Sequence, residues 1–234
     1  MIAIDGPAAA GKTTVARALA DRLGATFLDT GLLYRALTLA TLRAGIDPTD
    51  GDAIARLARQ SRFTILPPRT PDQIEEILLD GEVVTPELRT AAIDRHVSAV
   101  SAHPNVRAAL LPIQRRIAAA GTVVMVGRDI TTVVIPDAGI KVFLNASPAE
   151  RARRRLRELA ALGRNDTFED TLREIERRDR ADSTRAIAPL RAGNNVTVVE
   201  TDGRDVAEIV DEIAALARRI WHDDPMTIQC AAGR

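Results

Sequence analysis

The sequence contains few lysines, one cysteine, few aromatic residues and no excess of charge. Of its 32 basic residues only Lys12 and Lys141 are lysines, and the rest are arginines. Basic and acidic residues cancel, 32 against 32, which excludes the global positive field that holds nucleic acid or an anionic membrane surface. The single cysteine, Cys230, excludes an internal disulfide and is typical of a reducing compartment. In so arginine-rich a chain, a lysine retained at position 12 is a functional candidate.

Long hydrophobic runs are missing as well. Stretches such as Val123–Val126 are far too short to cross a bilayer, and Asp5 interrupts the N-terminal apolar run before a signal-peptide core forms. We therefore expect a cytoplasmic protein that binds neither membranes nor nucleic acid. With 234 residues, of which 46% are hydrophobic, the chain can build an ordinary globular core.

Short apolar runs alternate with amphipathic segments along most of the chain. We expect strands at residues 2–4, 26–28, 123–126, 142–144 and 196–199, and helices at 12–23, 33–45, 86–120 with a break at Pro104, and 205–220. This alternation predicts βαβ units and a parallel sheet. Between prolines, residues 61–85 hold three short β-rich pieces, which predict a small antiparallel insertion attached to the main sheet.

Two helix starts carry capping signals. Ser147-Pro148-Ala149-Glu150 combines the Ser-x-x-Glu capping box with proline at the first helical position. Thr167 to Asp170 is a weaker version of the same box before another helix. Residues 151–191 contain 12 arginines and 8 acidic residues, a local charge of +4 in a neutral chain. No period follows Trp221, so we expect a loose tail there.

A phosphate-binding loop is predicted near the start of the chain. Gly6-Pro7-Ala8-Ala9-Ala10-Gly11-Lys12-Thr13 matches the Walker A pattern G-x-x-x-x-G-K-[ST] at every fixed position. In such a loop backbone N–H groups surround the phosphates, and the positive end of the next helix points at them. Lys12 reaches the β- and γ-phosphates, and the Thr13 hydroxyl ligates Mg²⁺. The motif, extended to Thr14, predicts a nucleoside triphosphate site.

The rest of the sequence narrows the class of protein that uses this loop. No Asn-Lys-x-Asp tetrapeptide of the GTP-binding switches occurs. Motor and transport ATPases usually have an apolar strand that ends in Asp-Glu, whereas here strand 123–126 runs into Gly127-Arg128-Asp129. A small-molecule kinase is the leading interpretation.

Four further segments carry a resemblance to a known family. They are Ile4-Asp5-Gly6-Pro7, Leu28-Asp29-Thr30-Gly31 with Tyr34-Arg35, Val126-Gly127-Arg128-Asp129-Ile130, and Asp182 through Arg185 to Pro189-Leu190. From Ile2 to about Ile220 the chain resembles the bacterial-type cytidylate kinases. The resemblance implies direct in-line transfer of the ATP γ-phosphate, with Mg²⁺, to the small-molecule substrates CMP and dCMP. We expect the enzyme to be a monomer.

The same resemblance implies a P-loop three-layer α/β fold. Its parts are a five-stranded parallel sheet, a small antiparallel insertion in the monophosphate-binding region, and a helical lid. We expect one kinase domain over residues 1–220, with a core at 1–60 and 121–220. The monophosphate-binding region falls at about 61–120, the lid at about 150–185, and a C-terminal tail at 221–234.

The resemblance also assigns residues that read the base. Arg128 and Asp129 directly follow a buried strand, which places them at the carboxyl edge of the sheet, where α/β proteins bind ligands. By similarity, Asp129 and Ser98 accept from the cytosine amino group, and Arg107 donates to N3 and O2. Uracil places an acceptor against Asp129, and each unpaired buried group costs about 1–3 kcal/mol. The assignment therefore predicts a preference for cytosine.

Further residues match positions that hold the monophosphate and the ribose. Arg35 and Arg128 resemble the family's phosphate clamps, because a guanidinium fork matches two phosphate oxygens. Arg178, Asp182 and Arg185 fall at i, i+4 and i+7, one stripe of a single unbroken helix. The substrate-binding set is Thr30, Tyr34, Arg35, Ser98, Arg107, Arg128, Asp129, Arg178, Asp182 and Arg185. The catalytic set is Lys12, Arg128, Asp129 and Arg185.

Some questions stay open from the sequence. Arg151, Arg153, Arg154, Arg155 and Arg157 include one or two lid arginines that touch ATP, but the sequence does not say which. A role for Asp129 as general base is also undecided. The alternatives in function are a kinase for UMP or AMP, and a non-catalytic sensor that binds ATP.

Overall fold

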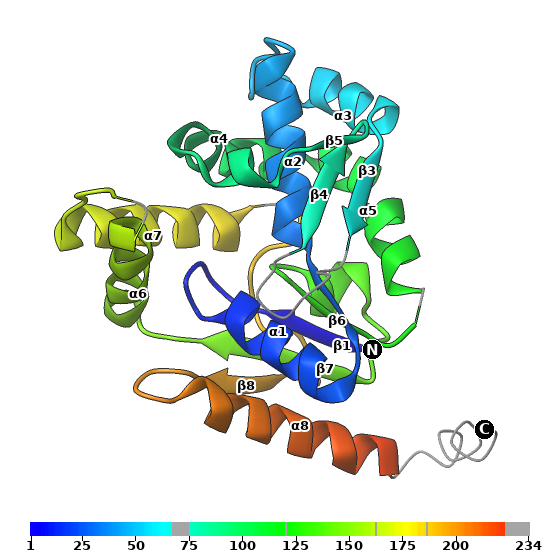
Figure 1. Cartoon of the computed structure of the whole chain (residues 1–234), viewed down its shortest axis with the longest axis vertical. Helices are drawn as coiled ribbons and strands as arrows, with labels where there is room; N and C mark the ends of the chain where they lie inside the picture. The colour runs from blue at the N-terminus through cyan, green and yellow to red at the C-terminus, as the bar shows by residue number, and fades with distance from the viewer. Residues whose placement is uncertain (67–74, 120, 162, 186, 223–234) are drawn as a thin grey trace.

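The core of the molecule is a five-stranded parallel sheet. The computed structural model describes residues 1–66, 75–119, 121–161, 163–185 and 187–222. In the sheet the strands follow the order β2-β6-β1-β7-β8, and every neighbouring pair is parallel (Figure 1). The strands are β1 (Ile2–Asp5), β2 (Thr26–Asp29), β6 (Val123–Gly127), β7 (Ile140–Asn145) and β8 (Thr197–Glu200). The parallel sheet predicted from the sequence is confirmed.

Helices cover both faces of this sheet. On one face α1 (Lys12–Leu23) and α8 (Val206–His222) pack beside each other, and their apolar residues share a core with β1, β6, β7 and β8 (Figure 1). On the other face, apolar residues of α5 (Pro104–Ala118) and of the π-helical turn η2 (Ile130–Val134) pack on β1, β2 and β6. Because all five strands run the same way, their carboxyl ends meet at one edge between these layers.

A second apolar core lies beyond that edge. It is formed by α2 (Thr30–Arg43), α3 (Gly51–Gln60), α4 (Ala91–Ala102), α5 and a short 3-10 helix, η1 (Thr85–Arg89). Of three antiparallel strands, β3 (Phe63–Leu66) and β4 (Glu76–Leu79) pack on it, and the exposed β5 (Glu82–Val83) pairs with β4. These strands form a separate sheet, so the expectation that they attach to the main sheet was wrong. Their apolar faces pack on the helices instead.

Helix α3 was not predicted from the sequence. It begins after Asp50, whose side chain accepts a hydrogen bond from the backbone N–H of Ala53 at 2.9 Å. This is an ordinary N-cap. The cap and the apolar residues Ile54 and Ala58, four positions apart on the buried side, are the signals that could have located it.

Two helices, α6 (Pro148–Ala161) and α7 (Phe168–Thr184), pack on each other beside the sheet edge (Figure 1). Both predicted caps form: Ser147 Oγ accepts from Glu150 N at 3.3 Å, and Thr167 Oγ1 accepts from Asp170 N at 3.1 Å. The first capping box is only half made, because the backbone N–H of Ser147 donates to the Asp202 carboxylate rather than to Glu150. At the other end of the chain α8 runs to His222, and the tail at 223–234 lies outside the described residues.

Candidate active site

The predicted phosphate loop joins β1 to α1 at the carboxyl edge of the sheet. Gly6 has a φ of 153°, and a Cβ there would lie 2.2 Å from the carbonyl oxygen of Leu144, so the loop can pass the sheet only with glycine. Gly11, which precedes α1, has a φ of 88° and gives the helix no side-chain cap. The first turn of α1 contains no acidic residue. Its N–H groups and positive dipole end are therefore available to an anion.

Lys12 lies across this loop. It is only 8% exposed, and its Nζ donates to the carbonyl oxygen of Pro7 at 2.6 Å. Burial lowers the pKa of Lys12 well below its usual value, and the positive charge of Arg128 lowers it further. The negative charge of an anionic ligand in the loop would oppose both effects by attracting the ammonium, so Lys12 is placed to gain from a phosphate.

A pair of oxygen ligands lies beside the lysine. Thr13 Oγ1 donates to Asp29 Oδ2 at 2.9 Å, and Asp29 Oδ1 accepts from the backbone N–H of Gly31 at 2.9 Å. A hydroxyl and a carboxylate are hard oxygen donors of the kind that Mg²⁺ takes together with substrate phosphates. The residues present therefore fit the metal. Asp29 belongs to a motif of the sequence analysis, but no role was predicted for it. Thr14, which was predicted to belong to the nucleotide site, is exposed on α1.

Asp5, the last residue of β1, holds the segment that follows β6. Its Oδ1 accepts from the backbone N–H of Ile130 at 2.8 Å, and its Oδ2 accepts from the N–H and hydroxyl of Thr131 at 2.8 and 2.7 Å. Burial raises the pKa of Asp5, although these hydrogen bonds oppose the shift. The three contacts fix the turn that carries Arg128 and Asp129, a role that the sequence did not reveal.

Asp129 and Arg107 form a buried pair. The distance from Arg107 Nη2 to Asp129 Oδ2 is 2.5 Å, and the two residues are 8% and 5% exposed. Arg107 also donates to the carbonyl of Ser101 at 2.9 Å and lies over the Tyr34 ring, 5.2 Å from its centroid. Burial raises the pKa of the Tyr34 hydroxyl. Three residues predicted to bind substrate are thus brought together from α2, α5 and the end of β6.

Four of the predicted arginines, Arg35, Arg128, Arg178 and Arg185, form a cluster that includes Asp182. Arg128 Nε donates to Asp182 Oδ2 at 3.0 Å, and Arg185 Nη1 lies 3.7 Å from Asp182 Oδ1. Burial lowers the pKa of Arg178 to about 10, and the charges of Arg128 and Arg35 contribute to that shift. Arg178 Nε and Arg185 Nη2 are buried without a hydrogen-bond partner among the described residues. Buried donors of this kind are costly unless a ligand satisfies them, and phosphate oxygens would do so.

The structure shows how the predicted residues Arg185 and Thr30 are held. Helix α7 ends at Thr184, and Arg185 has extended backbone angles, so Arg178, Asp182 and Arg185 do not share one helical stripe. Arg185 instead reaches the cluster from the following turn, where its Nε donates to the Ala188 carbonyl at 2.5 Å. Thr30 is buried and donates to the Val126 carbonyl at 2.9 Å, holding β2 against β6.

Ser98 lies half-buried on α4. Within the described residues, no hydrogen bond joins its hydroxyl to Arg107 or Asp129. Its role as a reader of the base therefore stays a prediction, and Arg107 bonds instead to the Ser101 carbonyl one turn along.

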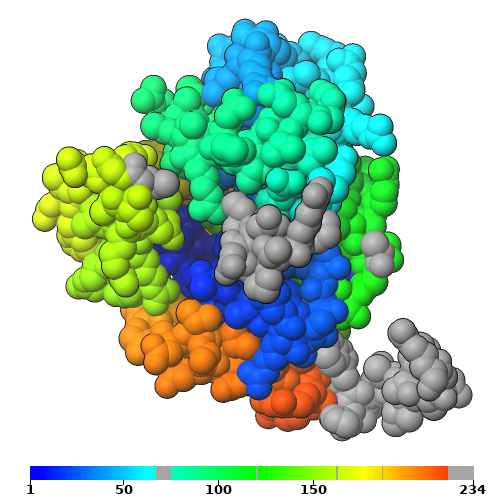
Figure 2. All heavy atoms as spheres, viewed as in Figure 1, coloured from blue at the N-terminus to red at the C-terminus, as the bar shows by residue number. Residues whose placement is uncertain are grey.

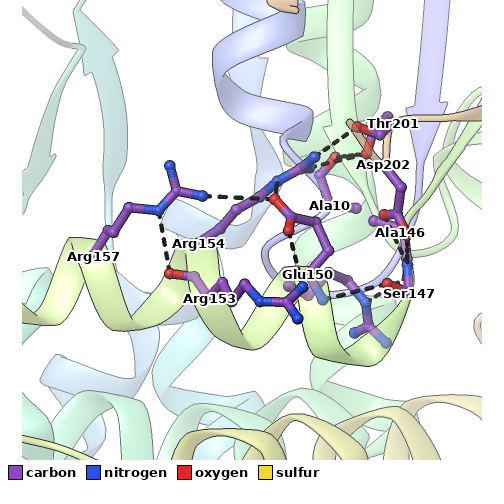
Figure 3. Close-up of polar contacts among 10 residues, drawn as sticks. Ala10, Ala146, Ser147, Glu150, Arg153, Arg154, Arg157, Thr201 and Asp202 are labelled. Atoms are coloured by element: carbon purple, nitrogen blue, oxygen red, sulfur yellow. Dashed lines mark hydrogen bonds and ion pairs between the residues drawn. The ribbon is translucent and has the colours of Figure 1, made fainter. Parts of the chain in front are cut away.

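Four of the five arginines of α6, which the sequence left unassigned, differ in exposure and in the contacts that they make. Arg154 donates to the Thr201 hydroxyl at 2.9 Å and to its carbonyl at 2.6 Å, and it lies next to the phosphate loop (Figure 3). Arg151 is buried and forms a bidentate pair with Asp179 of α7. Arg153 and Arg157 are exposed and bond within α6. In Figure 2 the blue N-terminal segment lies in a hollow bordered by the yellow-green surface of α6 and α7.

Comparisons with known proteins identify the family. The family model described as cytidylate kinase matches residues 2–219. A cytidylate kinase of Mycobacterium avium (strain 104) is 46% identical over 220 residues, which are 94% of this chain and 95% of that protein. A cytidylate kinase of Carboxydothermus hydrogenoformans is 45% identical over 218 residues, 93% of this chain and 97% of that protein.

A solved structure shows the same fold at low identity. An uncharacterized protein from Eubacterium ventriosum ATCC 27560 superposes with a TM-score of 0.51 at 12% identity, over 93% of this chain and 97% of that one. No helix within the described residues is long and apolar enough to cross a membrane. The phosphate loop, the arginine cluster and the match over nearly the whole length lead to one conclusion: this chain belongs to the cytidylate kinase family and is a P-loop kinase that phosphorylates CMP.

Proposed function

We propose that this enzyme transfers the γ-phosphoryl group of ATP, with Mg²⁺, to CMP and dCMP in the cytoplasm, acting as a monomer. The observation that carries the proposal is a pair of buried guanidinium nitrogens, Arg178 Nε and Arg185 Nη2, that have no hydrogen-bond partner among the described residues. Arg185 lies close enough to the Arg107–Asp129 pair to be affected by both of its charges. A nucleoside monophosphate would supply phosphate oxygens for the two arginines and a base for the Arg107–Asp129 pair.

The phosphate loop and α6 form the proposed donor site. Loop N–H groups bind the ATP phosphates, and Lys12 exchanges its contact with the Pro7 carbonyl for the β- and γ-phosphates. Thr13 and Asp29 would hold Mg²⁺, which neutralises charge on the phosphate oxygens when bound. We assign the ATP contact of α6 to Arg154, because its Nη1 lies 3.6 Å from the point that a Cβ of Gly11 would occupy. Arg151 also reaches the loop, but it is held in a bidentate pair with Asp179.

The Arg107–Asp129 pair forms the proposed base site. Asp129 uses Oδ2 for Arg107, so its Oδ1 can accept from the cytosine amino group while Arg107 donates to the acceptors of the ring. Arg35, Arg128 and Arg178 bind the monophosphate, and Arg185 approaches the transferred group. Catalysis then consists of in-line positioning and charge neutralisation, since loose phosphoryl transfer requires little covalent chemistry from a protein.

Helices α6 and α7 act as the proposed lid. Arg151 connects the lid to the core, because its guanidinium bonds to Asp179 of α7, to the Ala146 carbonyl at 2.9 Å and to the Ala8 carbonyl of the phosphate loop at 3.4 Å. A lid tied to the loop in this way closes over both phosphates and excludes water, which would otherwise hydrolyse ATP.

A comparison of four monophosphates tests the substrate. We expect kcat/KM for CMP and dCMP to exceed that for UMP by about 10- to 100-fold, because uracil leaves the Asp129 carboxylate facing an acceptor. The measurement is ADP release in a coupled assay with saturating Mg-ATP. A preference for AMP or UMP would contradict the base assignment. Absence of both ADP and CDP would favour the ATP sensor instead.

Substitution of Arg178 with methionine tests the phosphate assignment. The variant loses a phosphate contact, and we expect KM for CMP to rise about 10-fold or more. It also removes a guanidinium whose buried Nε has no partner in the described part of the chain, so we expect the free energy of unfolding to stay unchanged or to rise. Urea titration and initial rates measure the two effects.

Arg177→Met is the matched control. Arg177 is the neighbouring residue of α7, is 52% exposed, and pairs with Glu174 on the same helix. Its substitution should change neither KM nor stability appreciably. Arg178 would not be a phosphate ligand if both variants behaved alike.

A further inference from the structure

Asp94 binds two arginines that come from different parts of the fold. Its Oδ1 accepts from Arg35 Nη2 at 2.8 Å, and its Oδ2 accepts from Arg155 Nη2 at 2.8 Å. Asp94 lies on α4, Arg35 on α2 and Arg155 on α6. The Asp94 side chain is only 17% exposed, so water competes weakly for these contacts. One carboxylate therefore connects the proposed monophosphate clamp to the proposed lid.

The contacts of Arg35 fix its orientation and leave donors free. Its Nη1 donates to the Leu88 carbonyl at 2.8 Å while its Nη2 bonds to Asp94. A guanidinium has five N–H donors in a rigid plane, so two contacts leave three for a ligand. Arg35 also lies close enough to Arg178 for its charge to lower the pKa of Arg178. Asp94 and Leu88 thus hold the guanidinium of Arg35 beside the proposed phosphate site.

The lid places further charge on the same carboxylate. Arg155 divides its guanidinium between Asp94 and Glu158 of its own helix, and Arg164, beyond the end of α6, has its Nη1 4.0 Å from Asp94 Oδ2. Helix α4 also packs against α7. Movement of α6 away from α4 would break the bond to Arg155 and leave the Asp94 carboxylate with Arg35 alone.

We propose that Asp94 is a positioning residue for the kinase reaction, which holds Arg35 toward the monophosphate and couples that orientation to docking of Arg155 from the lid. The proposal rests on the proposed role of Arg35 in binding the monophosphate. We do not expect Asp94 itself to contact the substrate, because Arg35 and Arg155 occupy its two carboxylate oxygens.

Because Asp94 is negatively charged, the direction in which KM for CMP changes on its neutralisation distinguishes between its possible roles. If Asp94 acted only through its field, its neutralisation would remove a repulsion and lower KM for CMP. If it acts by orienting Arg35, its neutralisation frees the guanidinium and raises KM for CMP. A role only in stability would lower the free energy of unfolding and leave the ratio of the two KM values unchanged.

Asp94→Asn in the full-length enzyme tests these alternatives. We expect KM for CMP to rise about 5- to 20-fold, KM for ATP to change less than about 2-fold, and circular dichroism to stay that of the wild type. A fall in KM for CMP, or equal rises for both substrates, overturns the proposal. Asp94→Glu, which keeps the charge, should recover part of the loss.

A double-mutant cycle with Arg155→Gln tests the connection to the lid. Arg155 is 25% exposed on α6, more than Asp94. We therefore expect its substitution to leave the fold intact, even if Asp94→Asn were to disturb it. We expect Arg155→Gln to raise KM for CMP about 3- to 10-fold in the wild type but less than about 2-fold beside Asp94→Asn. Equal effects in the two backgrounds overturn the coupling.

Two further variants complete the design. Arg153→Gln is the matched control, because Arg153 lies on the same helix, is 61% exposed and pairs only with Glu150 among the described acidic residues; its KM values should match the wild type. Arg35→Gln separates the proposal from the site assignment. If Arg35→Gln leaves KM for CMP unchanged, the site assignment fails. If it raises that KM while Asp94→Asn does not, only the role of Asp94 fails.

Discussion

Lys12→Ala is expected to lower kcat by about 10³-fold or more while KM for CMP changes little. The ammonium is buried across the phosphate loop and bonded to the Pro7 carbonyl, where a γ-phosphate gives it its strongest partner. With the proposed lid closed, the transferred group would develop charge in a space that excludes water, so we expect that solvent does not compensate for the loss of this cation. Single-turnover kinetics with Mg-ATP and CMP measure the effect on the chemical step.

Substitution of Lys141 is the control for this experiment. Lys141 is the only other lysine of the 234 residues. It lies on β7, away from the loop, and its exposed Nζ donates to the Pro136 carbonyl at 3.2 Å. Lys141→Ala should leave kcat and both KM values unchanged. Comparable losses in the two variants, or a loss of CMP binding in Lys12→Ala, would indicate damage to the fold rather than to the donor site.

Asp129→Ala is expected to impair the enzyme in two ways. KM for CMP should rise about 10- to 100-fold, far more than KM for ATP, because the cytosine amino group loses its acceptor. The free energy of unfolding should fall by about 3–5 kcal/mol, because Arg107 is left buried without its counter-ion. The Arg107–Asp129 contact of 2.5 Å between side chains less than 10% exposed is the reason for the second effect.

A double variant separates recognition from stability. Asp129→Asn combined with Arg107→Met removes both charges and leaves no unpaired ion in the interior. We expect it to recover most of the lost stability in urea titration, since apolar replacement of a buried pair is often neutral. It should not recover the affinity for CMP. Recovery of both would show that the pair is structural and that another group reads the base.

The first part of the fold was predictable from a contiguous segment of sequence. Strand β1, the phosphate loop and α1 are contiguous, and their residue pattern alone located them. Helix α3 was missed although Asp50 caps it. The prediction that Arg178, Asp182 and Arg185 share one helical stripe was wrong, because α7 ends at Thr184. Helix ends depend on the contacts beyond them, and here Arg185 turns away to bond with the Ala188 carbonyl.

The roles of three acidic residues, for which the sequence predicted nothing, were the least predictable. Asp5, Asp29 and Asp94 each bond to partners on other elements: the turn after β6, the start of α1, and helices α2 and α6. No local pattern separates such a carboxylate from one that is solvated at the surface. Only the packing of these elements reveals that Asp94 is shared by Arg35 and Arg155.

The sequence by itself determined the fold class, the phosphate loop and the family, because each depends on patterns within short segments or on similarity along the whole chain. The tertiary structure decided which charged groups meet: Arg107 with Asp129, Arg128 with Asp182, and Arg35 with Asp94. The physical reason is that an ion pair acts over a few ångströms. Residues far apart in the chain come that close only when helices pack at the edge of the sheet.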